Sequence, residues 1–386
     1  MIRTTPPPEP HPLVPLEDLE VPAWPERAAV KMAAMRLRTL LTRSDQRPFI
    51  AEDRLDDSAD VFSDMATPPF CIPLMTELDD TLMDWAADPA PGQWIKPVVL
   101  PPCDEQGLLS QWARRHHHEV LAPSARDALL IDTPEQTLDL SGDGVLVIPR
   151  LEDWFLRHRC GLGLIRSLLE SLAGLERHCV IGCNSWAWAF LCKAVDAHLI
   201  LPEPLTFKPF DESRLRRWIA DIVRQQAVEG TRFRLNSNGK NIFALDRKDR
   251  PREAYFETLA ARSRGIAWVA WHIWQRSLKK ARDTEDNDYS DDDQQTLWVV
   301  ALEEFSLPGS DGTQALLILQ ALLIHNSLSG RELECVLPDP GFQGMHHALH
   351  RAGFITEHHG RYYCRPAAYP AIRNGLATAG FPLDGY

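Results

Sequence analysis

The chain has 386 residues and a formal net charge of −13, which is enough length for two or three domains, each with its own core. The negative balance excludes a protein that coats nucleic acid or an anionic membrane with its whole surface, although a local basic face remains compatible with it. The sequence has neither a run of about 18–20 apolar residues nor a signal peptide, so we expect a cytoplasmic protein without membrane insertion.

The first 93 residues divide into two parts of different composition. Residues 1–25 hold prolines at positions 6, 7, 8, 10, 12, 15, 22 and 25, which predicts a disordered, proline-rich arm rather than a helix or a central strand. From Pro25 the stretch "PERAAVKMAAMRLRTLLTR" repeats apolar residues at helical spacing after a proline that favours a helix start. We therefore expect an N-terminal helical extension over residues 26–93.

Residues 94–208 alternate short aliphatic runs with helical patterns. The runs are "IKPVVL" (95–100), "EVLAP" (119–123), "GVLVIP" (144–149) and "HCVIGC" (178–183), and "HLILP" (198–202) is a candidate fifth strand. Helical patterns such as "GLLSQWARRH" and "GLGLIRSLLESLAGLERH" lie between them. Strand, helix and strand in alternation predict an α/β core with a parallel sheet covered on both faces.

Residues 209–282 favour helices. "DESRLRRWIADIVRQQ" begins with a capping Asp or Ser, and "EAYFETLAARSRGIAWVAWHIWQRSLKK" carries a long apolar face. The polar run "DTEDNDYSDDD" follows and cannot bury itself, so residues 283–295 are expected to be an acidic linker.

Residues 296–386 predict a third kind of unit. Three helices are expected at "GTQALLILQALLIH", "SGRELECVL" with Ser329 as its cap, and "GFQGMHHALHRAG". Two short strands, "FITEH" and "RYYCRP", turn at His359 and Gly360, and the helix "AYPAIRNGLATAG" closes the chain. Three helices followed by a hairpin are typical of a winged helix.

This order of elements over residues 90–386 resembles a P-loop ATPase module of the AAA+ or STAND type with a C-terminal winged helix, as in origin-recognition ATPases. The run 95–100 and "PPCDEQGLLSQWARRH" match the first strand, phosphate loop and helix of that family. Gly144–Ile148 matches the strand that ends in magnesium-binding acids, and Asn184 stands where the family senses the γ-phosphate. The resemblance implies an α/β fold with a P-loop-NTPase-like core, a helical lid over 209–282 and a winged-helix domain.

The same positions lack the chemistry of an ATPase. A phosphate loop needs glycines, a Lys and a Ser or Thr, whereas "PPCDEQGL" supplies prolines, two acids and no Lys. Pro149 and Arg150 follow the strand Gly144–Ile148 where acids belong, and Ala267 replaces an Arg of the lid. The degenerate nucleotide-site positions are Pro101, Pro102, Cys103, Asp104, Glu105, Gly107, Pro149, Arg150, Glu152 and Asn184. We therefore expect no catalytic residue, weak or no ATP binding and no other cofactor.

The predicted third helix and wing of the winged helix are the candidate contacts to a partner. They offer Gln343, His346, His347, His350, Arg351, His359 and Arg361. From Asp311 onward the chain has six acids against five arginines and no Lys, which is a poor match for DNA. We favour docking on protein over DNA binding.

Four other motifs have two readings each. "RRHHHE" (114–119) is a solvated helix end or a metal site, and we favour the helix end because adjacent histidines diverge. Cys179 and Cys183, with Cys160 and Cys192, are buried thiols or a zinc or redox pair, and burial is the default. "NSNGKN" (236–241) reads as a hairpin turn rather than a phosphate contact. The tryptophans of "NSWAWAFL" and "IAWVAWHIW" predict core packing, with a partner surface as the alternative.

These observations favour a catalytically degenerate AAA+ or STAND-like scaffold or adaptor that acts through protein contacts of its lid and winged helix. We predict no metal site. The alternatives are a DNA-binding winged-helix regulator and a nucleotide-binding ATPase subunit that a partner completes.

Overall fold

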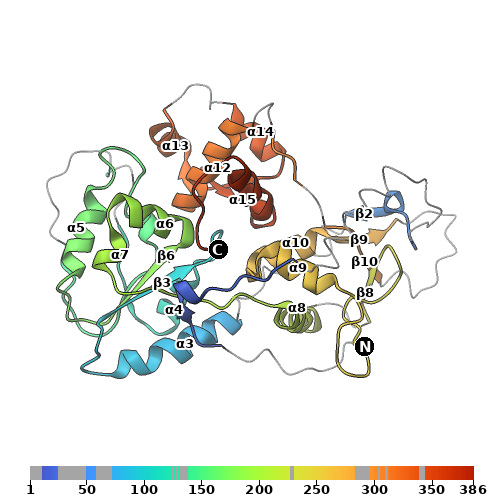
Figure 1. The fold of residues 1–386 in the computed structure, drawn as a ribbon, viewed down its shortest axis with the longest axis horizontal. Coiled ribbons are helices and arrows are strands. Elements are labelled where there is room, and N and C mark those ends of the chain that lie inside the picture. Colours follow the sequence, from blue (N-terminus) through green and yellow to red (C-terminus); the bar gives the residue numbers. More distant parts are fainter. Residues whose placement is uncertain are drawn as a thin grey trace. The chain divides into compact units, whose positions relative to one another are not determined.

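The computed structural model describes residues 11–24, 49–57, 72–123, 126, 129, 138–226, 230–282, 296–302, 305–308, 312–338 and 344–386. The chain folds into two compact units (Figure 1). The first, the lid unit, comprises residues 1–9, 21–71 and 209–304, and the second, the core unit, comprises 10–20, 72–208 and 305–386. The predicted helix at 25–43 and the acidic linker at 283–295 lie outside the described residues.

The core unit is built on a sheet of five parallel strands with one antiparallel edge strand. The strands are β1 (Val14–Pro15), β3 (Ile95–Leu100), β4 (Glu119–Val120), β5 (Leu146–Ile148), β6 (Cys179–Asn184) and β7 (Leu205–Thr206). Their order is β1-β7-β3-β6-β5-β4, and only β1 runs antiparallel, to β7. Val98, Val99, Val147, Val180 and Ile181 are fully buried, so the sheet is covered on both faces, as its continuous apolar runs predict.

Helices cover the two faces of this sheet in the way that right-handed crossovers require. On one side α3 (Ile72–Ala87) packs against α4 (Leu108–Arg115). On the other, α7 (Ala197–Ile200) contacts both α5 (Gly163–Leu172) and α6 (Ser185–Ala194). The mixed α/β class and the four strands at 95–100, 119–123, 144–149 and 178–183 are confirmed.

Two expectations about this unit are wrong. The run 198–202 is not a strand, because residues 197–200 form α7 and the fifth parallel strand is β7; a short apolar run does not distinguish a helix from a strand. The helical extension over 26–93 is not one segment either, since α3 belongs to the core unit while residues 50–57 belong to the lid unit.

The proline-rich arm is ordered from residue 11 to residue 24. Val14 and Pro15 pair with Thr206 and Leu205 at the sheet edge, where a proline is tolerated because one side of an edge strand needs no N–H donor. The N–H of Leu13 donates to Oγ1 of Thr81 at 3.1 Å, and the N–H of Leu16 donates to the carbonyl of Pro204 at 2.9 Å. The prediction of a disordered arm is therefore wrong over this segment.

We expect the amides of Leu13 and Leu16 to exchange at least about ten times more slowly than a random coil, because both are hydrogen-bonded. Hydrogen exchange read by NMR tests this. Thr81→Val removes the acceptor of Leu13 alone, so it should release Leu13 and leave Leu16 protected. Random-coil exchange at both amides in the wild type would contradict the packing of this segment.

The C-terminal module, defined as residues 305–386, surrounds a central helix within the core unit. That helix, α12 (Thr313–His325), is apolar on all sides, and Ala315, Ile318, Leu319 and Leu322 are fully buried. Around it lie α13 (Gly330–Val336), α14 (Met345–Arg351) and α15 (Tyr369–Thr378). The strands β11 (Leu328–Ser329), β12 (Ile355–His358) and β13 (Arg361–Cys364) form an antiparallel sheet of order β11-β13-β12. Ser329 caps α13 in a full capping box with Glu332, as its sequence predicts.

The lid unit combines three helices with a four-stranded sheet. The helices are α8 (Glu212–Gln226), α9 (Tyr255–Ser263) and α10 (Ala267–Arg276), and the strands β2 (Leu55–Asp57), β8 (Arg232–Leu235), β9 (Leu278–Ala281) and β10 (Thr296–Val299) have the order β2-β9-β10-β8. The helices were predicted, but the sheet was not. Because β10 pairs with β8 and β9, the predicted domain start at residue 296 is wrong, and the C-terminal module starts at residue 305.

Candidate functional site

The loop between β3 and α4 folds around the carboxylate of Asp104. Asp104 accepts hydrogen bonds from the N–H groups of Gln106, Gly107 and Leu108, at 3.2, 2.9 and 2.8 Å. Free N–H groups at a helix start make a ready site for a phosphate. Here the chain's own carboxylate, itself buried, takes that place.

The rest of the loop supports this closed arrangement. Pro101, Pro102 and Cys103 are buried, whereas Glu105 is exposed. Gly107 has φ +69°, and a Cβ built on it would lie 3.3 Å from a guanidinium nitrogen of Arg150. Burial raises the pKa of the Cys103 thiol well above its ordinary value, so this cysteine is not a reactive nucleophile.

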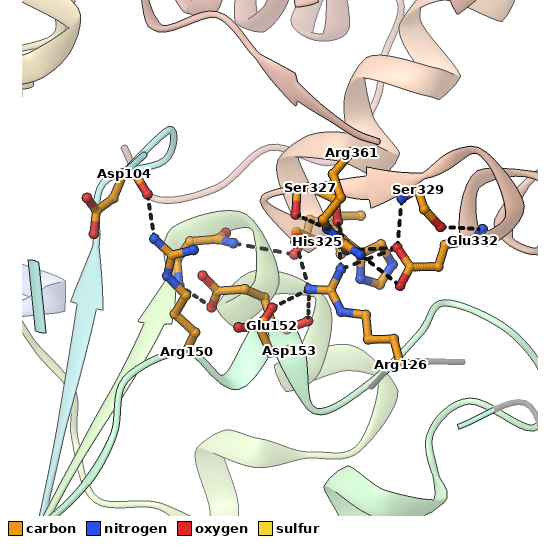
Figure 2. A network of polar contacts seen from close by, with 12 residues as sticks. Asp104, Arg126, Arg150, Glu152, Asp153, His325, Ser327, Ser329, Glu332 and Arg361 are labelled. Carbon is orange, nitrogen blue, oxygen red and sulfur yellow. Dashed lines mark hydrogen bonds and ion pairs between the residues drawn. The ribbon is translucent and has the colours of Figure 1, made fainter. Parts of the chain in front are cut away.

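Arg150 is held by this loop rather than by a ligand (Figure 2). It follows Pro149 after β5, and one guanidinium nitrogen donates to the carbonyl oxygen of Asp104 at 2.7 Å. Nearby Asp104, Glu152 and Asp153 keep the guanidinium charged and raise its pKa despite burial. Arg150 is therefore a charged residue that is engaged within the protein at the end of β5.

Glu152 and Asn184 meet at the carboxyl edge of the sheet, as their positions after β5 and at the end of β6 predict. The N–H of Asn184 donates to Oε2 of Glu152 at 3.1 Å, and Glu152 is 2% exposed. The side chain of Asn184 caps α6 by accepting from the N–H of Ala187 at 2.8 Å, and its amide donates to the carbonyl of Ile324 at 3.4 Å. Both side chains are thus engaged within the protein.

Burial raises the pKa of Glu152 to about 7, and the adjacent Asp153 adds to the rise. This carboxyl therefore changes its charge near neutral pH, although it has no exposed path to a substrate in the described structure. Buried groups with such shifts mark functional sites in some proteins and structural networks in others.

Arg126 joins the sheet edge to the C-terminal module, and the sequence analysis did not single it out. Its guanidinium donates to Oδ1 of Asp153 at 2.6 Å and to the carbonyl of Glu152 at 2.8 Å. It also donates to the carbonyls of Ser327 and His325 at 2.6 and 2.9 Å. The residue is 6% exposed, so one buried cation holds together segments about 200 residues apart in sequence.

Glu332 and Arg361 complete this buried network on the side of the module (Figure 2). Arg361 donates to Oε2 of Glu332 at 2.8 Å and, through Nε, to the hydroxyl of Ser327 at 3.0 Å. Nη1 of Arg126 lies 3.9 Å from Oε2 of Glu332. His325 lies fully buried beside them, and burial together with the nearby arginines lowers its pKa well below the ordinary value, so its ring is neutral. Its Nε2 accepts from the N–H of Arg157 at 3.2 Å.

The C-terminal tail also packs on the core strands. Asp384 is buried and accepts from the hydroxyl of Ser185 at 2.5 Å, while a guanidinium nitrogen of Arg373 lies 3.3 Å from its Oδ1. Tyr386 is 1% exposed, and its hydroxyl lies 2.5 Å from Oγ1 of Thr206. The last residues of the chain therefore reach the start of α6 and strand β7.

The predicted partner contacts of α14 and the wing have different surroundings. His347, His350, Arg351 and His359 are exposed. His346 is half-buried against Tyr362, with ring centroids 5.3 Å apart. Gln343 lies outside the described residues. Arg361 is not an outward contact, because its guanidinium is bound to Glu332 and Ser327 inside the module.

The remaining motifs take structural roles. His116, at the end of α4, has its Nε2 2.7 Å from Oδ1 of Asp79. The described residues contain no cluster of three or more potential metal ligands. Cys179 and Cys183 are buried free thiols, and burial raises the pKa of Cys179 to about 12. Residues 236–241 form a turn, and the N–H of Leu235 donates to the carbonyl of Lys240 across it at 2.9 Å.

Four of the five tryptophans pack inside the protein rather than forming an exposed partner surface. Trp186, Trp188, Trp271 and Trp274 are buried, and Trp268 is half-buried. Trp271 and Trp274 pack with centroids 5.0 Å apart. An exposed tryptophan anchor for a partner is therefore absent at those four sites.

No protein-family model matches the sequence, and no curated protein matches it. Among solved structures, Cdc6p from Pyrobaculum aerophilum overlaps 85% of this chain and 100% of its own, at 12% identity and a TM-score of 0.30. The RuvB Holliday junction branch migration motor of Thermotoga maritima overlaps 88% of this chain and 99% of its own, at 12% identity and a TM-score of 0.29. Overlaps at these scores establish neither a family nor an activity. In the part of the chain that the structure describes, no helix is long and apolar enough to cross a membrane.

Proposed function

We propose that the chain is a degenerate relative of AAA+ ATPases that acts as a scaffold or adaptor and does not hydrolyse ATP. The order of its parallel strands supports the relationship. Numbered along the chain, the five strands lie in the order 5-1-4-3-2, and they form a parallel sheet such as the AAA+ resemblance implies. The helices and hairpin of the C-terminal module support a winged helix at the end of the chain.

The observation that carries the proposal is the carboxylate of Asp104, which binds the N–H groups of Gln106 and Gly107 in the loop and of Leu108, the first residue of α4. A γ- or β-phosphate at this helix start would have to displace the carboxylate and face its negative charge. Arg150 reinforces the closed loop through the carbonyl of Asp104. The site is therefore better suited to structural stability than to nucleotide turnover.

The engagement of Arg361 favours a protein partner over DNA. In the DNA-binding reading, this arginine of the wing would contact phosphate. Its guanidinium instead binds Glu332, which is 2% exposed, while the Arg361 side chain is 32% exposed, so a phosphate would compete with this carboxylate for the guanidinium. Arg351 remains exposed on α14, and that helix carries no Lys and no second Arg.

Calorimetry with ATP and magnesium tests the proposal. We expect no heat of binding in the micromolar range and no release of phosphate above the buffer rate, because the anion position is filled. Asp104→Ala is the matched variant: it frees the three N–H groups but loses about 1 kcal/mol of capping energy. Micromolar ATP affinity in the wild type that disappears when residues 101–107 are changed would contradict the proposal. It would favour an ATPase subunit that a partner completes.

A further inference from the structure

The lid unit holds a strongly basic segment within an acidic protein. Residues 209–282 contain 17 Lys and Arg against eight Asp and Glu, a net charge of +9, although the whole chain carries −13. The net charge of the whole chain does not reveal this basic segment. Residues 283–304 of the same unit hold nine Asp and Glu and no Lys or Arg, so the basic residues attract polyanions only where they are exposed.

Part of this charge lies on two consecutive turns that the carboxylate of Glu253 connects. We call residues 236–253 the basic double turn. The first turn follows β8, and Gly239 within it has φ +69°. In the second, Oδ1 of Asp246 accepts from the N–H groups of Lys248 and Arg250 at 2.7 and 2.9 Å. Glu253 ties the turns together, because it binds Nζ of Lys240 at 2.8 Å and the side-chain amide of Asn238 at 3.2 Å.

The second turn presents three cations to solvent. Arg247, Lys248 and Arg250 are all exposed. Two carboxylates belong to the same turn. Asp246 accepts from main-chain N–H groups, which lower its pKa and keep it charged, and Asp249 is exposed between Lys248 and Arg250. The backbone that carries these cations is therefore already ordered. Ligand binding does not have to supply the free energy for ordering it.

An exposed aromatic ring lies on the first turn. Phe49 is 63% exposed. A Cβ built on Gly239 would lie 3.0 Å from Cδ2 of this ring, so the ring rests on the glycine backbone. The N–H of Ile50 donates to the carbonyl of Asn236 at 3.1 Å, and the centroids of Phe49 and Trp298 are 5.6 Å apart. The ring is thus held in place while most of its surface faces water.

We propose that the basic double turn and Phe49 form a binding surface for single-stranded nucleic acid. Arg247, Lys248 and Arg250 contact backbone phosphates, and Phe49 stacks on an unpaired base. A duplex offers the same phosphates but no unstacked base, so a single strand binds more tightly. The inference concerns the lid unit alone and holds whether or not the core unit binds ATP.

The test is fluorescence anisotropy of the full-length protein with a labelled mixed-sequence 20-nucleotide strand and the matching duplex, between 50 and 300 mM salt. We expect salt-dependent binding of the strand. Removing three phosphate contacts in the triple variant Arg247→Ser, Lys248→Ser and Arg250→Ser should reduce the salt slope by about two. It should also weaken binding by at least about tenfold. Phe49→Ala should weaken strand binding about five- to 100-fold and leave duplex binding unchanged.

Two controls separate this surface from general electrostatics. The variant Arg159→Ser, Arg166→Ser and Lys193→Ser removes the same charge from exposed positions of the core unit, and Arg351→Ala removes the exposed arginine of α14. Both should bind the strand like the wild type. Three results would overturn the inference: no strand binding at 50 mM salt, equal loss in either control, or binding only to anionic vesicles.

Discussion

Replacing Arg126 by methionine is expected to lower the free energy of unfolding of the core unit by about 3–5 kcal/mol, the range for breaking a buried ion pair. Methionine fills much of the same volume but donates no hydrogen bond. The change leaves the carbonyls of Glu152, His325 and Ser327 without this donor and removes one of the cations beside Glu332. Native-state hydrogen exchange at the buried amides of α12 measures the loss.

The chemistry of the network suggests two companion variants. Arg126→Lys keeps the charge but not the planar fork, so it should recover less than half of the lost stability. Arg166→Met removes an exposed arginine of α5 and should change stability by less than about 0.5 kcal/mol. An Arg126→Met protein as stable as the Arg166→Met protein would show that the C-terminal module does not depend on this buried cation.

The parallel sheet and the capped helices were predictable because their signals are local. Continuous apolar runs mark β3, β5 and β6, and Ser329 with Glu332 forms a capping box that can be read from four residues. The positions of Glu152 and Asn184 followed from the same logic, since the carboxyl ends of neighbouring parallel strands share one edge. In the structure the two residues meet, and the N–H of Asn184 donates to Glu152.

What the sequence could not supply depends on contacts between distant residues. Arg126 stands in the stretch "SARDALL", where nothing distinguishes it from a surface arginine of a helix. Its role appears only when residues 325–332 are brought beside it. The sequence shows Asp104 only as an acid in the loop, and its hydrogen bonds to the N–H groups of Gly107 and Leu108 appear only in the structure. The sheet of the lid unit was missed because β2 and β10 lie about 240 residues apart from one another in sequence and are each only a few residues long.

The pH dependence of stability should carry the signature of Glu152. Burial and the neighbouring Asp153 raise its pKa from 4.5 to about 7 in the folded protein, whereas the unfolded chain keeps the ordinary value. Between these two values the folded state holds a proton that the unfolded state releases. Stability therefore falls as the pH rises from 4.5 through 7, and one shifted group accounts for a loss of about 3 kcal/mol across this window.

The variant Glu152→Gln isolates this contribution. Glutamine resembles the protonated acid, and its side-chain oxygen can still accept from the N–H of Asn184. At pH 5 the variant and the wild type should be similarly stable, and at pH 8 the variant should be more stable by up to about 3 kcal/mol. Hydrogen exchange of the α12 amides at a series of pH values, corrected for intrinsic rates, gives both curves.

Glu170→Gln is the matched control, because it makes the same chemical change at an exposed position of α5. Its stability curve should run parallel to that of the wild type at every pH. If the Glu152→Gln curve also runs parallel to that of the wild type, the pKa of Glu152 is the same in the folded and the unfolded protein. The edge of the sheet is then more hydrated than the burial of Glu152 implies. A curve that instead separates from the wild type above pH 5 identifies Glu152 as a buried acid whose ionisation weakens the folded core unit near neutral pH.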